Sequence, residues 1–334
     1  MRIFINTAKP GSLQLSAEDV QTATPEEKQQ LFIMRESLTY WKDAFRRFKR
    51  NKVAVASLIV IGLIAVFAFL GPLITPFSYS QQLRGWEYQF PGLTHLFGTD
   101  NLGRDMLARC MIGTRISLGV GFFCALIVVV IGTLYGAISG YKGGMTDNIM
   151  MRVAEVIYSI PDVLVVIILQ IALKEPLRQL FPGSTLGPSV ISLFIAFALL
   201  YWVTMARMVR GQILLLKEMD YVTAARAMGA RGAHTIRRHL IPNAIGVILV
   251  SATFQIPSAI FLESFLSFLG LGPSAPMASL GSLCSEALAG FRSYPYLLFI
   301  PALLISLIIL AFNLVGDGLR DALDPKLRSE KSGG

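Results

Sequence analysis

Length, composition and charge place the chain in a membrane. Of its 334 residues, 54% are hydrophobic and 15% are charged, whereas a soluble domain carries about 25% charged residues. The net charge of +9 does not predict nucleic-acid binding, because the Lys and Arg residues flank long apolar runs and do not form one basic groove. Three scattered cysteines without a Cys/His cluster predict neither a disulfide framework nor a structural metal.

The apolar runs predict an all-α membrane protein with six transmembrane helices. Residues 1–39 are polar and do not resemble a cleaved signal peptide, so we expect a cytoplasmic, partly disordered segment there. A helix needs about 20 apolar residues to cross the hydrocarbon core of a bilayer. The predicted spans, in chain order, are 53–74, 116–141, 148–173, 188–206, 245–271 and 296–316.

Positive charge near the span ends predicts the orientation. Six Lys and Arg residues within 42–52 put the N-terminus in the cytoplasm, and six spans return the basic C-terminal tail to the same side. The segment between spans four and five is then cytoplasmic, and it is also rich in arginine. The segment before span two should be external, yet it carries four arginines, which are Arg84, Arg104, Arg109 and Arg115.

These features divide the chain into five predicted parts. They are the polar segment 1–39, a basic entry helix with the first span at 40–76, an extracytoplasmic segment at 77–115, a transmembrane bundle at 116–318 with a cytoplasmic loop at 210–243, and a cytoplasmic tail at 319–334.

Small residues in the second span predict close helix packing. Gly132, Gly136 and Gly140 recur every four residues and therefore share one helix face. Small residues of this kind let two backbones approach closely in lipid. We expect a contact within this chain, with a contact to another subunit as the alternative.

Ionisable residues interrupt the third and fifth spans. Arg152 and Glu155 are three residues apart and can pair on one face of a helix. Asp162 follows a proline, where a kink would free backbone groups, and Glu263 lies within span five. Ionisable groups at membrane depth are costly and often mark a transport pathway. Asp162 and Glu263 are therefore candidate pathway residues, although a structural ion pair or an interfacial position explains each equally well.

The loop between spans four and five predicts two short helices. Asp220 can cap a helix over 221–228, Gly229 suits the left-handed residue that ends it, and a second helix can run over 230–240 before Pro242. The first helix has a surface of small residues at Ala224, Ala225 and Ala227. Such a helix can lie in a groove of another protein, or it can simply reverse the chain.

The same loop resembles the conserved cytoplasmic EAA motif of binding-protein-dependent ABC importer permeases. Ala224, Ala225, Gly229 and Pro242 match the motif at the right spacing, whereas Thr223, His239 and Ile241 stand where the family has Glu, often Ile, and Leu. The resemblance implies a bundle like that of type I ABC importer permeases, whose coupling helix docks on an ATPase subunit. The residues that it assigns to ATPase coupling are Asp220, Tyr221, Thr223, Ala224, Ala225, Arg226, Gly229 and Pro242.

Three further segments, 97–105, 262–272 and 316–325, resemble the dipeptide and oligopeptide branch of this family, and the C-type subunits of its oligopeptide systems above all. The resemblance implies a multi-pass protein of the bacterial inner membrane that forms half of a pore for peptides. It implies four kinds of partner: a B-type permease subunit, two ABC ATPase subunits, an extracytoplasmic peptide-binding protein and membrane lipid. ATP and Mg would be bound by the ATPase subunits.

Other functions were weighed against this interpretation. The chain has no phosphate-binding loop and no recognisable nucleophile and base, so we do not expect it to be an enzyme or to hydrolyse ATP itself. Related systems carry dipeptides, glutathione or nickel chelates, and these substrates stay open. A secondary transporter that works without ATP is the rival class, but we find no convincing inverted repeat between the two halves.

Overall fold

The computed structural model describes residues 40–182, 187–273 and 276–323, so the predicted segment 1–39 and most of the predicted tail lie outside the described residues. The chain divides into two units, Met1–Arg46 and Arg47–Gly334. Helix α2 (Tyr40–Arg50) crosses this division in the sequence and ends in a basic turn. All other elements below belong to the second unit. Its described residues form helices joined by turns, with a single isolated β-bridge and no sheet.

Five helical segments are long and apolar enough to cross a membrane. They are α3 (Lys52–Phe69), α5 (Met106–Lys142), α8 with η2 and α9 (Gly187–Leu216), a run of helix from α11 to η4 (Gly232–Leu271), and α14 (Tyr296–Leu323). A sixth span exists if α6 (Gly144–Tyr158) and α7 (Asp162–Leu180), which meet at 77°, are counted together. The all-α membrane fold is thus confirmed, and the segments follow the predicted order.

The third predicted span is wrong as a continuous helix over 148–173. Helix α6 ends at Tyr158, and α7 begins only at Asp162. Pro161 lies between them and has extended backbone (φ −60°, ψ 106°). A proline lacks the N–H that would continue the helical ladder and also keeps the preceding residue out of the helical conformation. The chain therefore turns sharply at the residue that the sequence had suggested only as a kink.

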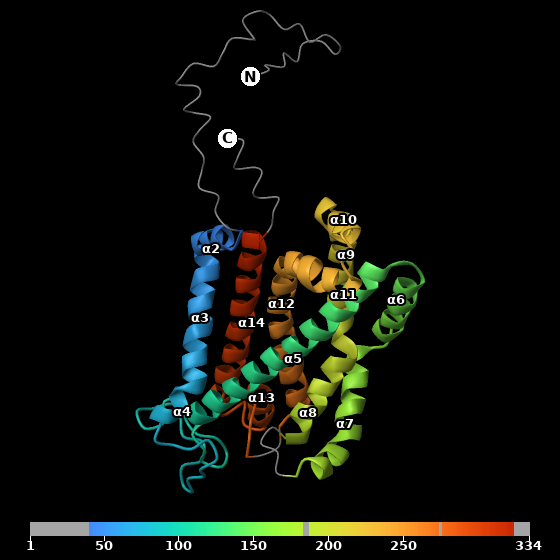
Figure 1. Ribbon diagram of the computed structural model, residues 1–334. Helices are drawn as coiled ribbons and strands as arrows, with labels where there is room; N and C mark the ends of the chain where they lie inside the picture. Colours follow the sequence, from blue (N-terminus) through green and yellow to red (C-terminus); the bar gives the residue numbers. More distant parts are fainter. Residues whose placement is uncertain (1–39, 183–186, 274–275, 324–334) are drawn as a thin grey trace, which may run out of the picture. The chain divides into compact units, whose positions relative to one another are not determined.

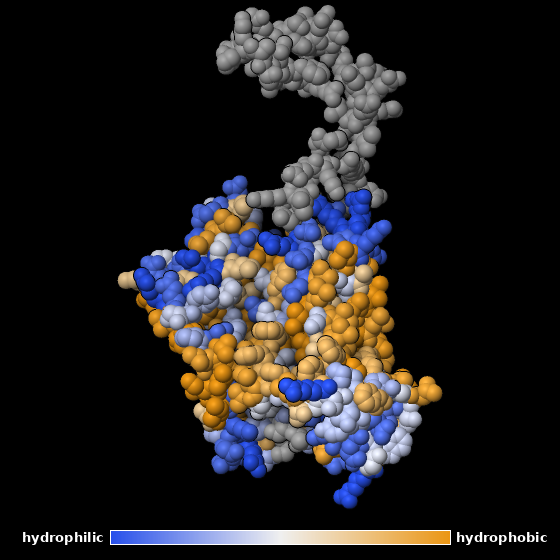
Figure 2. All heavy atoms as spheres, turned by 180° about the vertical axis from the view of Figure 1, so that it is seen from behind, coloured by the Kyte–Doolittle hydropathy of each residue, from blue (hydrophilic) through white to orange (hydrophobic). Residues whose placement is uncertain are grey.

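The surface supports a membrane-spanning orientation of the long helices. Figure 2 shows hydrophobic residues gathered in a band around the middle of the bundle, with hydrophilic residues at both ends. Many of the large apolar side chains are exposed, such as Leu63 on α3 and Leu303 on α14. In lipid this exposure is favourable, because the solvent of the band is itself apolar.

Helix α5 crosses the bundle from end to end (Figure 1) and packs against α3, α9 (Trp202–Leu216) and α12 (Ile241–Leu266). At one end of the bundle lie α4 (Gly71–Ile74), the irregular segment that follows it and α13 (Leu280–Ala287). At the other end lie α10 (Asp220–Ala227) and α11 (Gly232–Thr235). The two ends of α5 therefore belong to the two different faces of the membrane band.

The contact between α5 and α9 is close because one face of α5 is made of glycine. A Cβ placed at Gly132 would lie 2.6 Å from the Cβ of Met205, and one at Gly136 would lie 2.3 Å from the carbonyl oxygen of Ala206. A Cβ at Gly140 would lie 3.0 Å from the Arg210 carbonyl oxygen. The structure thus places the three glycines at a contact within this chain.

Candidate functional site

Helix α10 is the centre of the candidate site, and its start differs from the prediction. Met219 is the N-cap, with extended backbone (φ −72°, ψ 144°), and no side chain caps the helix. Asp220 is the first helical residue, so the prediction that Asp220 caps the helix is wrong. Its carboxylate still lies in the first turn, where a negative charge is favourable against the partial positive charge of the helix N-terminus.

The end of α10 follows the sequence prediction. Gly229 has a φ of +85°, in the left-handed region that favours glycine. Its N–H donates to the Arg226 carbonyl, and the N–H of Ala230 donates to the Ala225 carbonyl at 3.1 Å. These two bonds form the Schellman arrangement that satisfies the last carbonyls of a helix. Apart from its two neighbours in the chain, no residue of the described ranges has an atom within 4 Å of a Cβ built at Gly229, so the turn faces open space.

The second predicted helix, over 230–240, is wrong in its bounds. Helix α11 begins at Gly232 and passes through the π turn η3 (Ile236–Leu240) directly into α12 (Ile241–Leu266). Pro242 lies in the first turn of α12 and does not separate the loop from the span. A π turn is wider than an α turn, which lets the helix continue past the proline ring.

The two faces of α10 have different environments. Val222 and Ala225 are 0% and 5% exposed and lie against the rest of the chain. The residues of the opposite face are exposed, and they include Thr223, Ala224 and Ala227. Met228, at the C-terminal end, is 84% exposed. Ala225 therefore holds α10 in place, whereas the other small residues of the motif lie on a surface that a partner can reach.

The base of this surface is held by an ion pair that sequence reasoning missed. Arg210 on α9 donates through Nε and Nη2 to the two carboxylate oxygens of Asp147 on α6, at 2.6 and 2.5 Å. The Ser139 hydroxyl on α5 donates to the same carboxylate, and Lys217 donates to the Gly140 carbonyl at 3.3 Å. Arg210 and Lys217 are visible in the sequence only as orientation charges. Asp147, an acidic residue at the start of an apolar run, was the available signal for a buried partner.

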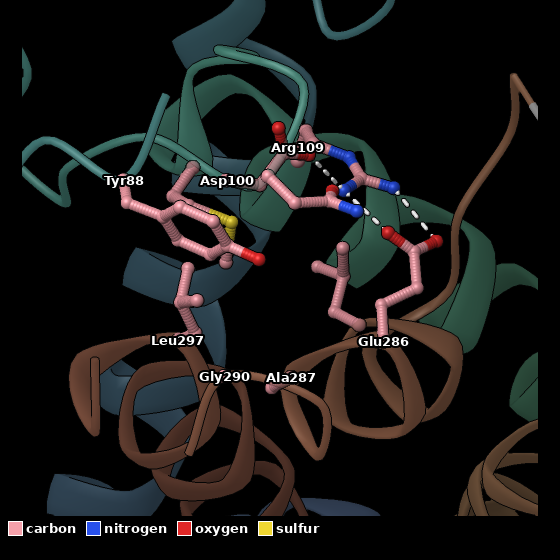
Figure 3. Close-up of a pocket in the computed structure, with 10 residues that line it drawn as sticks. Tyr88, Asp100, Arg109, Glu286, Ala287, Gly290 and Leu297 are labelled. Carbon is pink, nitrogen blue, oxygen red and sulfur yellow. Dashed lines mark hydrogen bonds and ion pairs between the residues drawn. The ribbon is translucent and has the colours of Figure 1, made fainter. Parts of the chain in front are cut away.

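At the opposite end of the bundle, two of the four arginines that disagree with the predicted orientation form ion pairs. Arg109 is 2% exposed and donates through Nη1 to Asp100 at 2.6 Å and through Nη2 to Glu286 at 3.0 Å. Figure 3 shows Arg109 and Glu286 pointing toward one another at the edge of a small pocket that Tyr88 also lines. Arg104 donates hydrogen bonds to the same two carboxylates, and its bond to Asp100 is 2.6 Å long. Glu286, on α13, was not singled out in the sequence.

The predicted in-membrane charges have three different environments. Arg152 and Glu155 pair at 3.2 Å with both side chains exposed, as their spacing predicted. Asp162 is exposed and accepts a hydrogen bond from the Tyr201 hydroxyl at 2.8 Å. Glu263 is 3% exposed and accepts bonds from the hydroxyls of Ser117 on α5 and Ser267, at 2.8 and 2.7 Å.

Comparison with protein families identifies the chain. The model of the family described as "Binding-protein-dependent transport system inner membrane component" matches residues 132–329, which include α10 and the long helices that hold it. The chain belongs to this family. Residues 39–91 also match the family described as "N-terminal TM domain of oligopeptide transport permease C".

Curated relatives place this permease among peptide systems. It is 44% identical over 296 residues to the oligopeptide transport system permease protein OppC of Bacillus subtilis (strain 168), covering 89% of this chain and 93% of the relative. It is 46% identical over 297 residues to the dipeptide transport system permease protein DppC of the same organism, covering 89% of each. Both relatives are named as transport permeases and not as enzymes. Like them, this permease is a multi-pass membrane protein.

A solved structure supports the fold alone. The inward-facing MetNI methionine ABC transporter contains a chain that covers 66% of this permease and is itself covered to 98%, with a TM-score of 0.50 and 21% identity. The similarity agrees with a bundle of the kind found in type I ABC importer permeases.

Proposed function

We propose that this permease forms half of the pore of an ATP-driven, binding-protein-dependent importer of oligopeptides. The observation that carries the proposal is the exposed face of α10, with its glycine turn at Gly229, in a chain 44% identical to an oligopeptide permease. One of two ATPase subunits docks on this face, and the two ATPase subunits bind ATP and Mg, which the permease itself does not bind. A B-type permease completes the pore, and an extracytoplasmic peptide-binding protein delivers the substrate.

In the proposed orientation α10, α11 and both termini are cytoplasmic, and α13 is extracytoplasmic. The sequence supports this choice through the basic residues around the first span. The structure supports it because Arg104 and Arg109 are paired with Asp100 and Glu286, so that two of the external arginines carry little uncompensated charge. Asp162 and Glu263 stay proposed pathway residues, of which Asp162 is the accessible one.

Dipeptides are the second candidate substrate, because the permease is 46% identical to a dipeptide permease. Glutathione and nickel chelates stay open as further alternatives. Membership of a binding-protein-dependent family argues against an ATP-independent secondary transporter.

Uptake of a labelled pentapeptide by cells lacking the gene tests the proposal. The cells are complemented with wild type, Gly229→Ala or Gly229→Trp. Both variants strain the backbone at a positive φ, by about 1 kcal/mol, but only tryptophan extends into the space that is open in the isolated chain. We expect wild type to restore uptake, Gly229→Ala to retain most of it, and Gly229→Trp to abolish it while inserting normally.

Equal uptake by both variants would show that no partner occupies the space beside Gly229. If complementation with the wild-type gene does not restore pentapeptide uptake either, oligopeptides are rejected as the substrate. Uptake of dipeptides and of nickel would then be measured in the same cells.

A further inference from the structure

The aromatic ring of Tyr141 lies between the two helices of the cytoplasmic loop. Tyr141 is the penultimate residue of α5. The guanidinium carbon of Arg226, on α10, lies 5.0 Å from the centre of the ring, which is a cation–π distance. A Cβ placed at Gly232, the first residue of α11, would lie 2.8 Å from Cε1 of the same ring. A side chain at position 232 would therefore require the ring to move, and glycine lets α11 approach Tyr141 this closely.

The neighbouring contacts make this end of α5 stiff. The ring packs with the main apolar core, which includes Val222 from the inner face of α10. Lys217 donates to the carbonyl of Gly140, one residue before the tyrosine. Helix α10, helix α11 and the end of α9 therefore all contact the last turn of α5.

Helix α5 is a continuous element between the two faces of the membrane band. It has 37 residues, which at 1.5 Å per residue is a length of about 55 Å. Its first turns carry Arg109, which is bound to Glu286 on α13. The cytoplasmic loop at one end and α13 at the other are thus joined through one helix.

We propose that Tyr141 is the positioning residue through which a displacement of α10 is passed to α5. Resting on the proposed function, the inference assigns to the ring the mechanical link between ATPase docking and the pore helix. Arg226 contacts the ring from α10, and the absence of a side chain at Gly232 lets α11 contact the same ring. Loss of the ring leaves α10 in place through Val222 but lets it move without α5.

The test compares Tyr141→Leu with Tyr141→Phe, which keeps the ring, and with Phe122→Leu, an exposed aromatic on the same helix. Each variant is reconstituted as the complete importer in proteoliposomes, and pentapeptide uptake and ATP hydrolysis are measured together. We expect the number of peptides moved per ATP to fall about fivefold in Tyr141→Leu, equivalent to about 1 kcal/mol, and to stay at the wild-type value in both controls. A ratio in Tyr141→Leu equal to wild type would overturn the inference.

A second measurement does not depend on substrate or ATPase. Spin labels at Met228→Cys on the exposed end of α10 and at Phe122→Cys on α5 report the distance between the two helices in the purified permease. We expect a broader distance distribution with Tyr141→Leu than with Tyr141→Phe. Equal widths would overturn the inference even in a permease that carries no peptide. Absence of ATP-dependent uptake by wild type, together with a broadened distribution, would reject the proposed function and leave the link between α10 and α5 standing.

Discussion

The contact between α5 and α9 gives a prediction whose magnitude follows from the structure. A Cβ at Gly136 would lie 2.3 Å from the Ala206 carbonyl oxygen, whereas real Cβ contacts essentially never fall below 3.0 Å. The obstacle is backbone, which cannot rotate aside as a side chain can. Because interiors are close-packed, Gly136→Ala must push the two helices apart by about 1 Å at this point.

Gly119 provides a matched control on the same helix, because nothing lies within 4 Å of a Cβ built there. Alanine removes the helix penalty of glycine at both positions, which is about 0.5–1 kcal/mol. At Gly136 the overpacking adds a cost of about 1–3 kcal/mol. We therefore expect Gly119→Ala to be neutral or stabilising and Gly136→Ala to be destabilised by about 1–2 kcal/mol.

The assay is unfolding of the purified permease in mixed detergent micelles, followed by the loss of helical circular dichroism as SDS is raised. Both variants are compared with wild type at equal protein and lipid content. If Gly136→Ala unfolds at the same SDS fraction as Gly119→Ala, the contact is looser than the structure shows and the reasoning is refuted.

Two further predictions concern buried groups. Glu263→Gln keeps an oxygen acceptor for one of the hydroxyls of Ser117 and Ser267 and offers an N–H donor to the other, so we expect a free energy of unfolding near that of wild type, whereas Glu263→Leu should lower it by about 1–3 kcal/mol. Loss of peptide uptake in a correctly assembled Glu263→Gln variant would show that the pathway requires the charge, and wild-type uptake would remove Glu263 from the proposed pathway residues. Burial, with a smaller contribution from the Glu263 carboxylate, raises the pKa of the Cys284 thiol to about 11. The reactive thiolate is therefore scarce at pH 8. Mass spectrometry should find that the rate of maleimide labelling at Cys284 is about a hundredfold lower than at an exposed cysteine and rises toward pH 11. A labelling rate that does not change between pH 8 and 10 would contradict this pKa.

Periodicity, charge and turn chemistry predict much of the fold, and the particular residues show why. Apolar runs of membrane length identify the spans, and Gly229 marks the end of α10 because only glycine adopts its backbone conformation readily. The break at Pro161 was visible as a proline, but its 77° angle depends on the helices around it. Pro242 lies in the first turn of α12, as expected for the entry to span five, but the sequence did not show that the π turn before it joins α12 to α11.

The contacts between distant segments could not be predicted from one sequence. Arg109 and Glu286 are 177 positions apart, and no local pattern brings them together. Tyr141 is an ordinary aromatic at the end of an apolar run until Arg226 and Gly232 are placed beside it. Family resemblance singled out the candidate coupling loop, but the division of its residues between the inner and outer faces of α10 needed the folded chain.

Docking of an ATPase on the outward face of α10 is the central claim, and site-specific photocrosslinking in cells tests it most directly. A photoreactive amino acid replaces Met228, which is 84% exposed, and in a control replaces Leu303, which is 68% exposed on α14. We predict a covalent adduct between position 228 and an ATPase subunit, and none from position 303. An importer that is assembled and active but gives no ATPase adduct from position 228 would contradict the claim.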